Sequence, residues 1–140
     1  LLFELRPDAL MNADLATLLP YLVDSAIART KAHVEFSLDE DVELTSEAKV
    51  VFYRIAQEAL NNIVKHAHAS EIAIGIYQTA TEVIMRIADD GVGFDTNQLP
   101  SGHFGLGIMQ ERARMIGAEL EVDTAPEQGT TIVLHWKRQH

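Results

Sequence analysis

Apolar residues recur with two different periods along the chain, and these periods divide it into helices and strands. A helical stripe predicts a first helix from Leu15 to about Thr30, with Asp14 as its N-cap. A second, wider stripe predicts a long helix from Ser46, its expected cap, to about Ala67. The apolar stripe of the first helix consists of Leu15, Leu18, Leu19, Leu22, Val23 and Ile27.

Alternating apolar and polar residues predict five strands, over residues 33–38, 71–78, 81–89, 119–124 and 130–137. A last helix is expected over residues 108–116, with Gly117 as its C-cap. Short connections join the second strand to the third and the fourth to the fifth, which indicates hairpins. This order of elements favours a mixed or antiparallel sheet covered by helices on one face.

Length and composition limit the classes of protein that the chain can represent. Its 140 residues fit one domain, and no apolar run is long enough to span a bilayer. The chain has no cysteine, so disulfides and thiolate metal sites are excluded. A net charge of −10 argues against nucleic-acid binding. It does not exclude a single phosphate ligand, because Mg²⁺ and a few local donors can offset the acidic field.

The polar side of the long helix carries a first group of candidate residues. Glu58, Asn62 and His66 follow one another at four-residue spacing, and Lys65 lies beside them. An amide oxygen can bind Mg²⁺, a lysine can pair with phosphate, and a glutamate can accept a proton. Taken alone, the same row also fits an ordinary solvated helix face.

A second group follows the third strand. Asp89 stands at the strand end, where a carboxylate can accept a hydrogen bond from an exocyclic amine such as that of adenine. Gly91 and Gly93 allow a sharp turn and a close approach of the backbone to a ligand. An acidic, glycine-rich turn explains this stretch equally well. A dinucleotide fingerprint lacks its third glycine, and there is no Walker A loop.

Two further signals come later in the chain. Gly105-Leu106-Gly107 precedes the last predicted helix, whose first backbone N–H groups can bind an anion such as a triphosphate. Thr130 opens the last strand, where its hydroxyl can support Asp89. Simple helix entry and a β-turn are the respective alternatives.

The order and spacing of these signals are more specific than any one of them. The segments EALNNIVKH, DDGVGF, GHFGLGIMQERA and GTTIV resemble the N, G1 and G2 boxes and the terminal threonine of histidine-kinase catalytic domains. These domains share the ATP-binding fold of gyrase, Hsp90 and the mismatch-repair ATPases. The LRP near the start and the ERA after the second glycine box resemble the subfamily of nitrate sensors and membrane-fluidity sensors, whose partner regulators are of the LuxR type.

The resemblance implies a role for each candidate on the long helix. It places Mg²⁺ on Asn62 and makes Glu58 the residue that activates the phosphoacceptor histidine. Lys65 and His66 match phosphate-contacting positions, and Asn61 falls where the family varies.

The glycine boxes carry the remaining implied roles. Asp89 matches the aspartate that binds the adenine amino group, with Thr130 beside it, and residues 95–104 match a short lid over ATP. The glycines match backbone positions around the nucleotide: Gly91 and Gly93 at the pocket floor, and Gly105 and Gly107 with Leu106 in the segment that closes over the phosphates.

The implied protein is an α+β, two-layer sandwich that transfers the γ-phosphoryl group of Mg-ATP to a histidine, for relay to a LuxR-type response regulator. That histidine is expected on an upstream dimerisation domain, of which residues 1–10 look like a remnant, whereas residues 11–140 form the catalytic domain. None of the six histidines lies in a phosphoacceptor context, so this chain is not expected to phosphorylate itself.

The resemblance also sets expectations for assembly and location. The isolated domain is expected to be a monomer, the full-length protein a homodimer, and the location the cytoplasm. An anti-sigma-type serine kinase and a nucleotide-sensing module without transfer activity are the alternatives within the fold.

Overall fold

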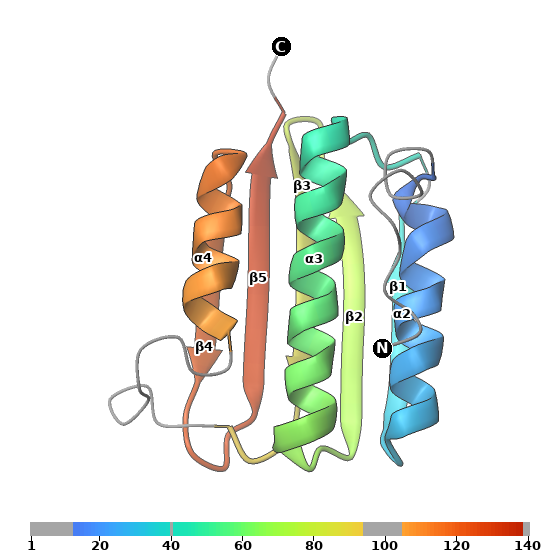
Figure 1. The fold of residues 1–140 in the computed structure, drawn as a ribbon, viewed down its shortest axis with the longest axis vertical. Coiled ribbons are helices and arrows are strands. Elements are labelled where there is room, and N and C mark those ends of the chain that lie inside the picture. Colours follow the sequence, from blue (N-terminus) through green and yellow to red (C-terminus); the bar gives the residue numbers. More distant parts are fainter. Residues whose placement is uncertain (1–12, 40, 94–104, 139–140) are drawn as a thin grey trace.

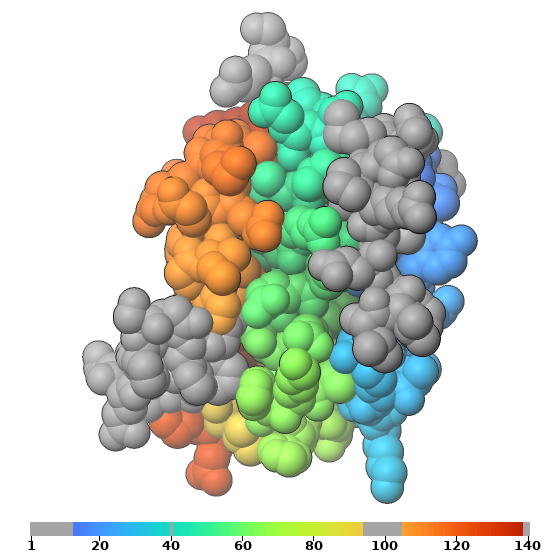
Figure 2. All heavy atoms as spheres, in the orientation of Figure 1, coloured from blue at the N-terminus to red at the C-terminus, as the bar shows by residue number. Residues whose placement is uncertain are grey.

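The computed structural model describes residues 13–39, 41–93 and 105–138, which form one sheet with helices on one face (Figure 1). In the space-filling view of that face, the helix Ser46–Asn62 runs down the middle between the helices Leu15–Arg29 and Leu106–Met115 (Figure 2). The predictions for residues 1–10 and for the lid at 95–104 lie outside the described residues. No helix in the described ranges combines the length and the apolarity that crossing a bilayer requires.

The described elements follow the predicted order. They are α2 (Leu15–Arg29), β1 (His33–Leu38), α3 (Ser46–Asn62), η1 (Ile63–Ala67), β2 (Glu71–Gln78), β3 (Glu82–Asp89), α4 (Leu106–Met115), β4 (Glu119–Thr124) and β5 (Thr130–Lys137).

The five strands are ordered β1-β2-β3-β5-β4 in the sheet. β1 pairs with β2 in parallel, and the other three pairings are antiparallel. Both predicted hairpins are therefore confirmed, as is the mixed, mostly antiparallel sheet. Because the described helices all cover the same face of the sheet, the fold is the two-layer α/β sandwich that the resemblance implied.

The core lies between the sheet and the helices, and it is built from rows of apolar residues that pair across the strands. Strand alternation turns every second residue of β2, β3 and β5 toward the helices. Two such rows are Ile76-Met85-Leu134 and Ile74-Ile87-Ile132, all nearly or fully buried. From the other layer, α2 and α3 bury their apolar stripes against these rows, with Leu19 and Phe52 both at 0% exposure.

Four details differ from the sequence-based expectations. Thr45, not Ser46, caps α3, because the Thr45 hydroxyl accepts the Ala48 N–H at 3.1 Å. The long helix is not α-helical throughout, since its last turn is the π-helix η1. Ile27 is 49% exposed, because Ala26 takes the inward position in the last turn of α2.

The fourth difference concerns the start of α4. This helix begins at Leu106, two residues before the predicted position. Gly105 serves as its N-cap in the left-handed conformation, with φ of 69°. The helix ends at Met115, one residue before the predicted end, with Ile116 as its C-cap. Gly117 comes directly after the C-cap with φ of 70°, which suits glycine.

Candidate functional site

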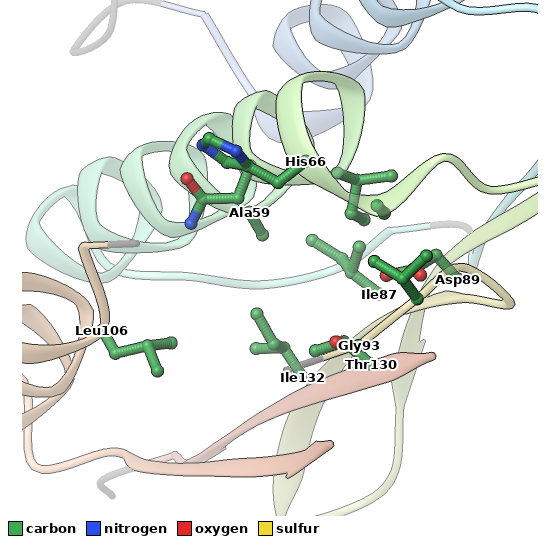
Figure 3. Close-up of a pocket in the computed structure, with 12 residues that line it drawn as sticks. Ala59, His66, Ile87, Asp89, Gly93, Leu106, Thr130 and Ile132 are labelled. Carbon is green, nitrogen blue, oxygen red and sulfur yellow. The ribbon is translucent and has the colours of Figure 1, made fainter. Parts of the chain in front are cut away.

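A pocket of about 220 Å³ lies between the C-terminal end of the long helix and the sheet. Figure 3 shows His66 reaching the pocket from the helix side, Asp89 and Thr130 from the strands, and Leu106 from the start of α4. Most of the wall is apolar. The lining residues are Ala59, Asn62, Ile63, His66, Ala67, Ile87, Asp89, Val92, Gly93, Leu106, Thr130 and Ile132.

The floor of the pocket is the row of the sheet where the apolar ladder ends. Asp89 on β3 pairs with Thr130 on β5, which in turn pairs with Thr124 on β4. Asp89 and Thr130 lie two residues along their strands from Ile87 and Ile132, so they face the helices in the next row across the sheet. The sheet therefore places a carboxylate and two hydroxyls where the next apolar row would otherwise stand.

Asp89 is the charged side chain that the fold buries within the described ranges, with 9% of its surface exposed. Its Oδ1 accepts the Gly91 N–H at 2.8 Å. The pKa of Asp89 is raised, mainly because burial disfavours the charged carboxylate. The backbone hydrogen bond from Gly91 lowers this pKa, the nearby charge of Asp90 raises it, and a backbone hydrogen bond from Thr130 lowers it. A buried acceptor at the end of an apolar pocket suits a planar ring that carries an amine.

Thr130 contacts this carboxylate through its backbone, whereas its hydroxyl lies 2.8 Å from the hydroxyl of Thr124. The sequence pointed to the Thr130 hydroxyl as the support of Asp89. The structure instead joins that hydroxyl to a threonine on the edge strand that the sequence did not single out.

Asp90, the next residue, lies outside the pocket wall, and its carboxylate binds backbone N–H groups instead. Its Oδ1 accepts the N–H groups of Ser70 at 2.7 Å and Glu71 at 2.9 Å. These bonds lower the pKa of Asp90, with Glu71 as the largest cause. Asp90 thus ties the end of β3 to the start of β2, and the two adjacent aspartates carry opposite pKa shifts.

Gly91 joins the floor of the pocket to the end of the long helix. The Val92 N–H donates to the carbonyl oxygen of Ala67, the last residue of η1, at 2.8 Å. A Cβ on Gly91 would lie 2.1 Å from that same oxygen. Gly91 is therefore outside the pocket wall, where it lets the backbone of this loop dock against the π turn.

Gly93 lines the pocket and also needs to be glycine. Its φ is 61°, and a Cβ there would lie 2.1 Å from the carbonyl oxygen of Ala125. The loop after β3 therefore packs against the β4–β5 connection, as well as against the helix.

On the helix side, the predicted row divides between the pocket and its rim. Asn62 and His66 line the pocket. Lys65 is exposed outside its wall, and Glu58 is half-buried one turn before Asn62. Asn61 turns elsewhere and accepts a hydrogen bond from Arg29 at 3.1 Å.

The third group lies at the start of α4. Leu106 lines the pocket, whereas Gly105 packs on Glu58 and Gly107 is exposed. The structure thus brings Asn62, His66, Asp89, Gly93, Leu106 and Thr130 to one pocket, and it places Glu58, Lys65, Gly91, Gly105 and Gly107 around it.

Sequence reasoning missed the apolar part of the wall. Ile63, Ile87 and Ile132 belong to regular stripes and look like any other core positions. Periodicity shows that a residue faces inward, but not whether its neighbour is a side chain or a cavity. No signal in the sequence separates the two cases.

The fold and the pocket define an α/β sandwich with a pocket between its helix layer and the end of its sheet. Residues 47–140 match the model of the histidine kinase-, DNA gyrase B- and HSP90-like ATPase family. The chain therefore belongs to that family.

Relatives matched over nearly the whole chain are named as histidine kinases. The signal transduction histidine-protein kinase/phosphatase DegS of Brevibacillus brevis is 33% identical over 96% of this chain and 35% of its own length. The sensor histidine kinase LiaS of Bacillus subtilis is 30% identical over 94% of this chain and 36% of its own length. The chain thus spans about a third of either relative.

Solved structures share the fold. The blue-light activated histidine kinase of Erythrobacter litoralis EL346 superposes with a TM-score of 0.75 at 22% identity, over 88% of this chain and 41% of that one. The Acinetobacter baumannii histidine kinase AdeS reaches the same TM-score of 0.75 at 13% identity, over 91% of this chain and 66% of that one.

Proposed function

We propose that the chain is the catalytic domain of a sensor histidine kinase, which binds Mg-ATP in this pocket and transfers its γ-phosphoryl group to a histidine of a dimerisation domain. The observation that carries the proposal is the buried carboxylate of Asp89 at the end of an apolar pocket. A carboxylate is a hydrogen-bond acceptor only, so it suits the exocyclic amine of adenine and opposes the carbonyl oxygen of guanine.

The size of the pocket suits the base rather than the whole nucleotide. Its volume of about 220 Å³ is below the roughly 300–1,000 Å³ of typical small-molecule pockets. Ile87 and Ile132 offer apolar contact to a base. The ribose and the phosphates then extend outward, past Asn62 and His66 and toward the start of α4.

Phosphates need positive partners, and the chain supplies them along that path. Lys65 and His66 follow Asn62 on the helix, and the first N–H groups of α4 at Gly105, Leu106 and Gly107 have no partner within the helix. Mg²⁺ is held mainly by phosphates and one or two protein oxygens, so the Asn62 amide oxygen suffices on the protein side. When bound, the ion offsets the charge of the transferring group.

Transfer forms a bond between an imidazole nitrogen and the γ-phosphorus, and it breaks the bond from that phosphorus to the bridging oxygen, with ADP as the leaving group. Glu58, half-buried next to the start of α4, accepts the imidazole proton in this scheme. The other residues hold the nucleotide, and such positioning supplies most of the catalysis in phosphoryl transfer.

The partners and the location belong to the same proposal. The dimerisation domain carries the phosphoacceptor histidine and makes the full-length protein a homodimer, while the isolated domain is a monomer. The LRP and ERA segments support a LuxR-type response regulator as the next acceptor. Both ATP and such a regulator are found in the cytoplasm.

Substitution of Asp89 tests the nucleotide site. Asp89→Asn removes the charge and puts an amide donor opposite the adenine amine. We expect it to weaken Mg-ATP binding by at least ~1.5 kcal/mol and to reduce the preference for ATP over GTP. Isothermal titration calorimetry with non-hydrolysable analogues measures both. Asp90→Asn is the matched control, because it makes the same change at a side chain that faces Ser70 and Glu71. Unchanged affinity in Asp89→Asn contradicts the assignment.

A transfer assay tests the chemistry. Incubation of the chain with a histidine-bearing dimerisation domain and labelled ATP should give an acid-labile phosphoprotein. An acid-stable product would instead indicate the serine kinase, and ATP binding without transfer to any such domain would indicate the nucleotide-sensing module.

A further inference from the structure

Glu58 lies directly against the start of α4. A Cβ added to Gly105, the N-cap residue of this helix, would lie 2.3 Å from Glu58 Oε1 and 2.9 Å from Cδ. The carboxylate therefore packs on the Gly105 backbone. It can approach this closely only because residue 105 has no side chain and tolerates φ of 69°.

The start of α4 favours negative charge. α4 spans 10 residues, has no side-chain cap, and carries no acidic residue in its first turn. The first N–H groups of a helix lack partners within it, and the helix dipole adds partial positive charge there. In the described structure the carboxylate beside this end is that of Glu58.

This is also where the proposed function puts the triphosphate. Leu106, the first residue of α4, lines the pocket and faces the long helix across it (Figure 3). The triphosphate and the Glu58 carboxylate are both anions, and they favour the same helix end. They repel each other at short range, so they do not both occupy that helix end.

We propose that, without nucleotide, Glu58 occupies the start of α4 in place of phosphate, and that the triphosphate displaces it. This inference rests on the proposed function and adds a positioning step to it. The carboxylate that accepts the histidine proton is held at α4 until the phosphates arrive, and it is then released beside the γ-phosphate. The base is thus exposed only in the state that also holds the phosphoryl donor.

Binding measurements on Glu58→Gln test this step, because glutamine keeps the shape and removes the charge. We expect this variant to bind a non-hydrolysable Mg-ATP analogue about two- to fivefold more tightly than the wild type, from the worth of an anion at a helix end. Adenosine, which has no phosphates, should bind both proteins equally. Calorimetry measures the analogue, and an NMR titration measures adenosine.

The matched control is Glu47→Gln, which makes the same change in the first turn of the same helix. Position 47 is eleven residues from position 58, about 16 Å along the helix and beyond the screening length at physiological salt. This control should bind the analogue as the wild type does. The amide resonances of Leu106 and Gly107 without nucleotide should shift in Glu58→Gln and stay in place in Glu47→Gln.

Three outcomes overturn the step: equal or weaker analogue binding by Glu58→Gln, an equal gain in Glu47→Gln, or unchanged Leu106 and Gly107 resonances. Each of them leaves nucleotide binding itself intact. Failure of the proposed function looks different, because the wild type would then bind no Mg-ATP in this pocket.

Discussion

The contact between Gly91 and Ala67 allows a stability prediction with a definite sign. Alanine at position 91 would bring its methyl group within 2.1 Å of the Ala67 carbonyl oxygen and 2.7 Å of the carbonyl carbon. Both atoms belong to the backbone, at the end of the π turn, so no side-chain rotation can relieve the clash. The loop must move away from the helix, and the hydrogen bond from Val92 to Ala67 must lengthen or break.

The cost has two parts. Overpacking in a tight site costs about 1–3 kcal/mol, and a lost backbone hydrogen bond costs about 1 kcal/mol. The free energy of unfolding should therefore fall by about 2–4 kcal/mol. For a domain of this size, that corresponds to a decrease in Tm of about 7–14 °C.

Urea unfolding followed by tryptophan fluorescence measures the change. The chain has a single tryptophan, Trp136, which is 6% exposed and donates a hydrogen bond to Ile116 at 3.2 Å. Gly107→Ala is the matched control, because a Cβ there meets no heavy atom within 4 Å. In a helix this change should stabilise by up to about 1 kcal/mol. The reasoning is refuted if Gly91→Ala is as stable as the wild type. It is also refuted if Gly107→Ala loses as much free energy of unfolding as Gly91→Ala does.

Three further predictions concern single side chains. In urea titrations, Thr45→Ala should lower the free energy of unfolding by about 1 kcal/mol, and Ser46→Ala should barely change it. A larger loss in Ser46→Ala than in Thr45→Ala would indicate that Ser46 is the cap. The carboxylate of Asp90 stabilises the fold above its unfolded pKa of about 3.8, and this stabilisation is lost as the pH falls through the lowered folded pKa. Asp89 has a raised pKa, so the fold becomes less stable as the pH rises from about 3.8 through the folded pKa of that residue. Urea titrations of Asp90→Asn and Asp89→Asn from about pH 3 to 7 should therefore differ from the wild type with opposite pH slopes, and parallel curves would contradict the assigned shifts. Asn62→Asp should change the Mg²⁺ dependence of ATP binding, so identical metal titrations would argue against Asn62 as a ligand.

The sequence determined the elements and the polar candidates. The periods of apolar residues predicted the helices α2 and α3 and the five strands, because burial on one face imposes the period of the element on the sequence. Asp89 could be found because a carboxylate ends a strand pattern and is followed by glycines that a core does not need. The positions of the boxes along the chain then indicated the family, which the comparison with known families confirms.

The tertiary structure decided which residues meet. Gly91 was expected to line the pocket, but it docks on Ala67, 24 positions earlier, at a π turn that no residue pattern announces. The contact between Glu58 and Gly105 and the pairing of Thr130 with Thr124 likewise join separate elements. Periodicity fixes only which face of an element turns inward. The distance between two such faces depends on how the whole sheet and its helices pack, and that information is spread over the core rather than held by the residues in contact.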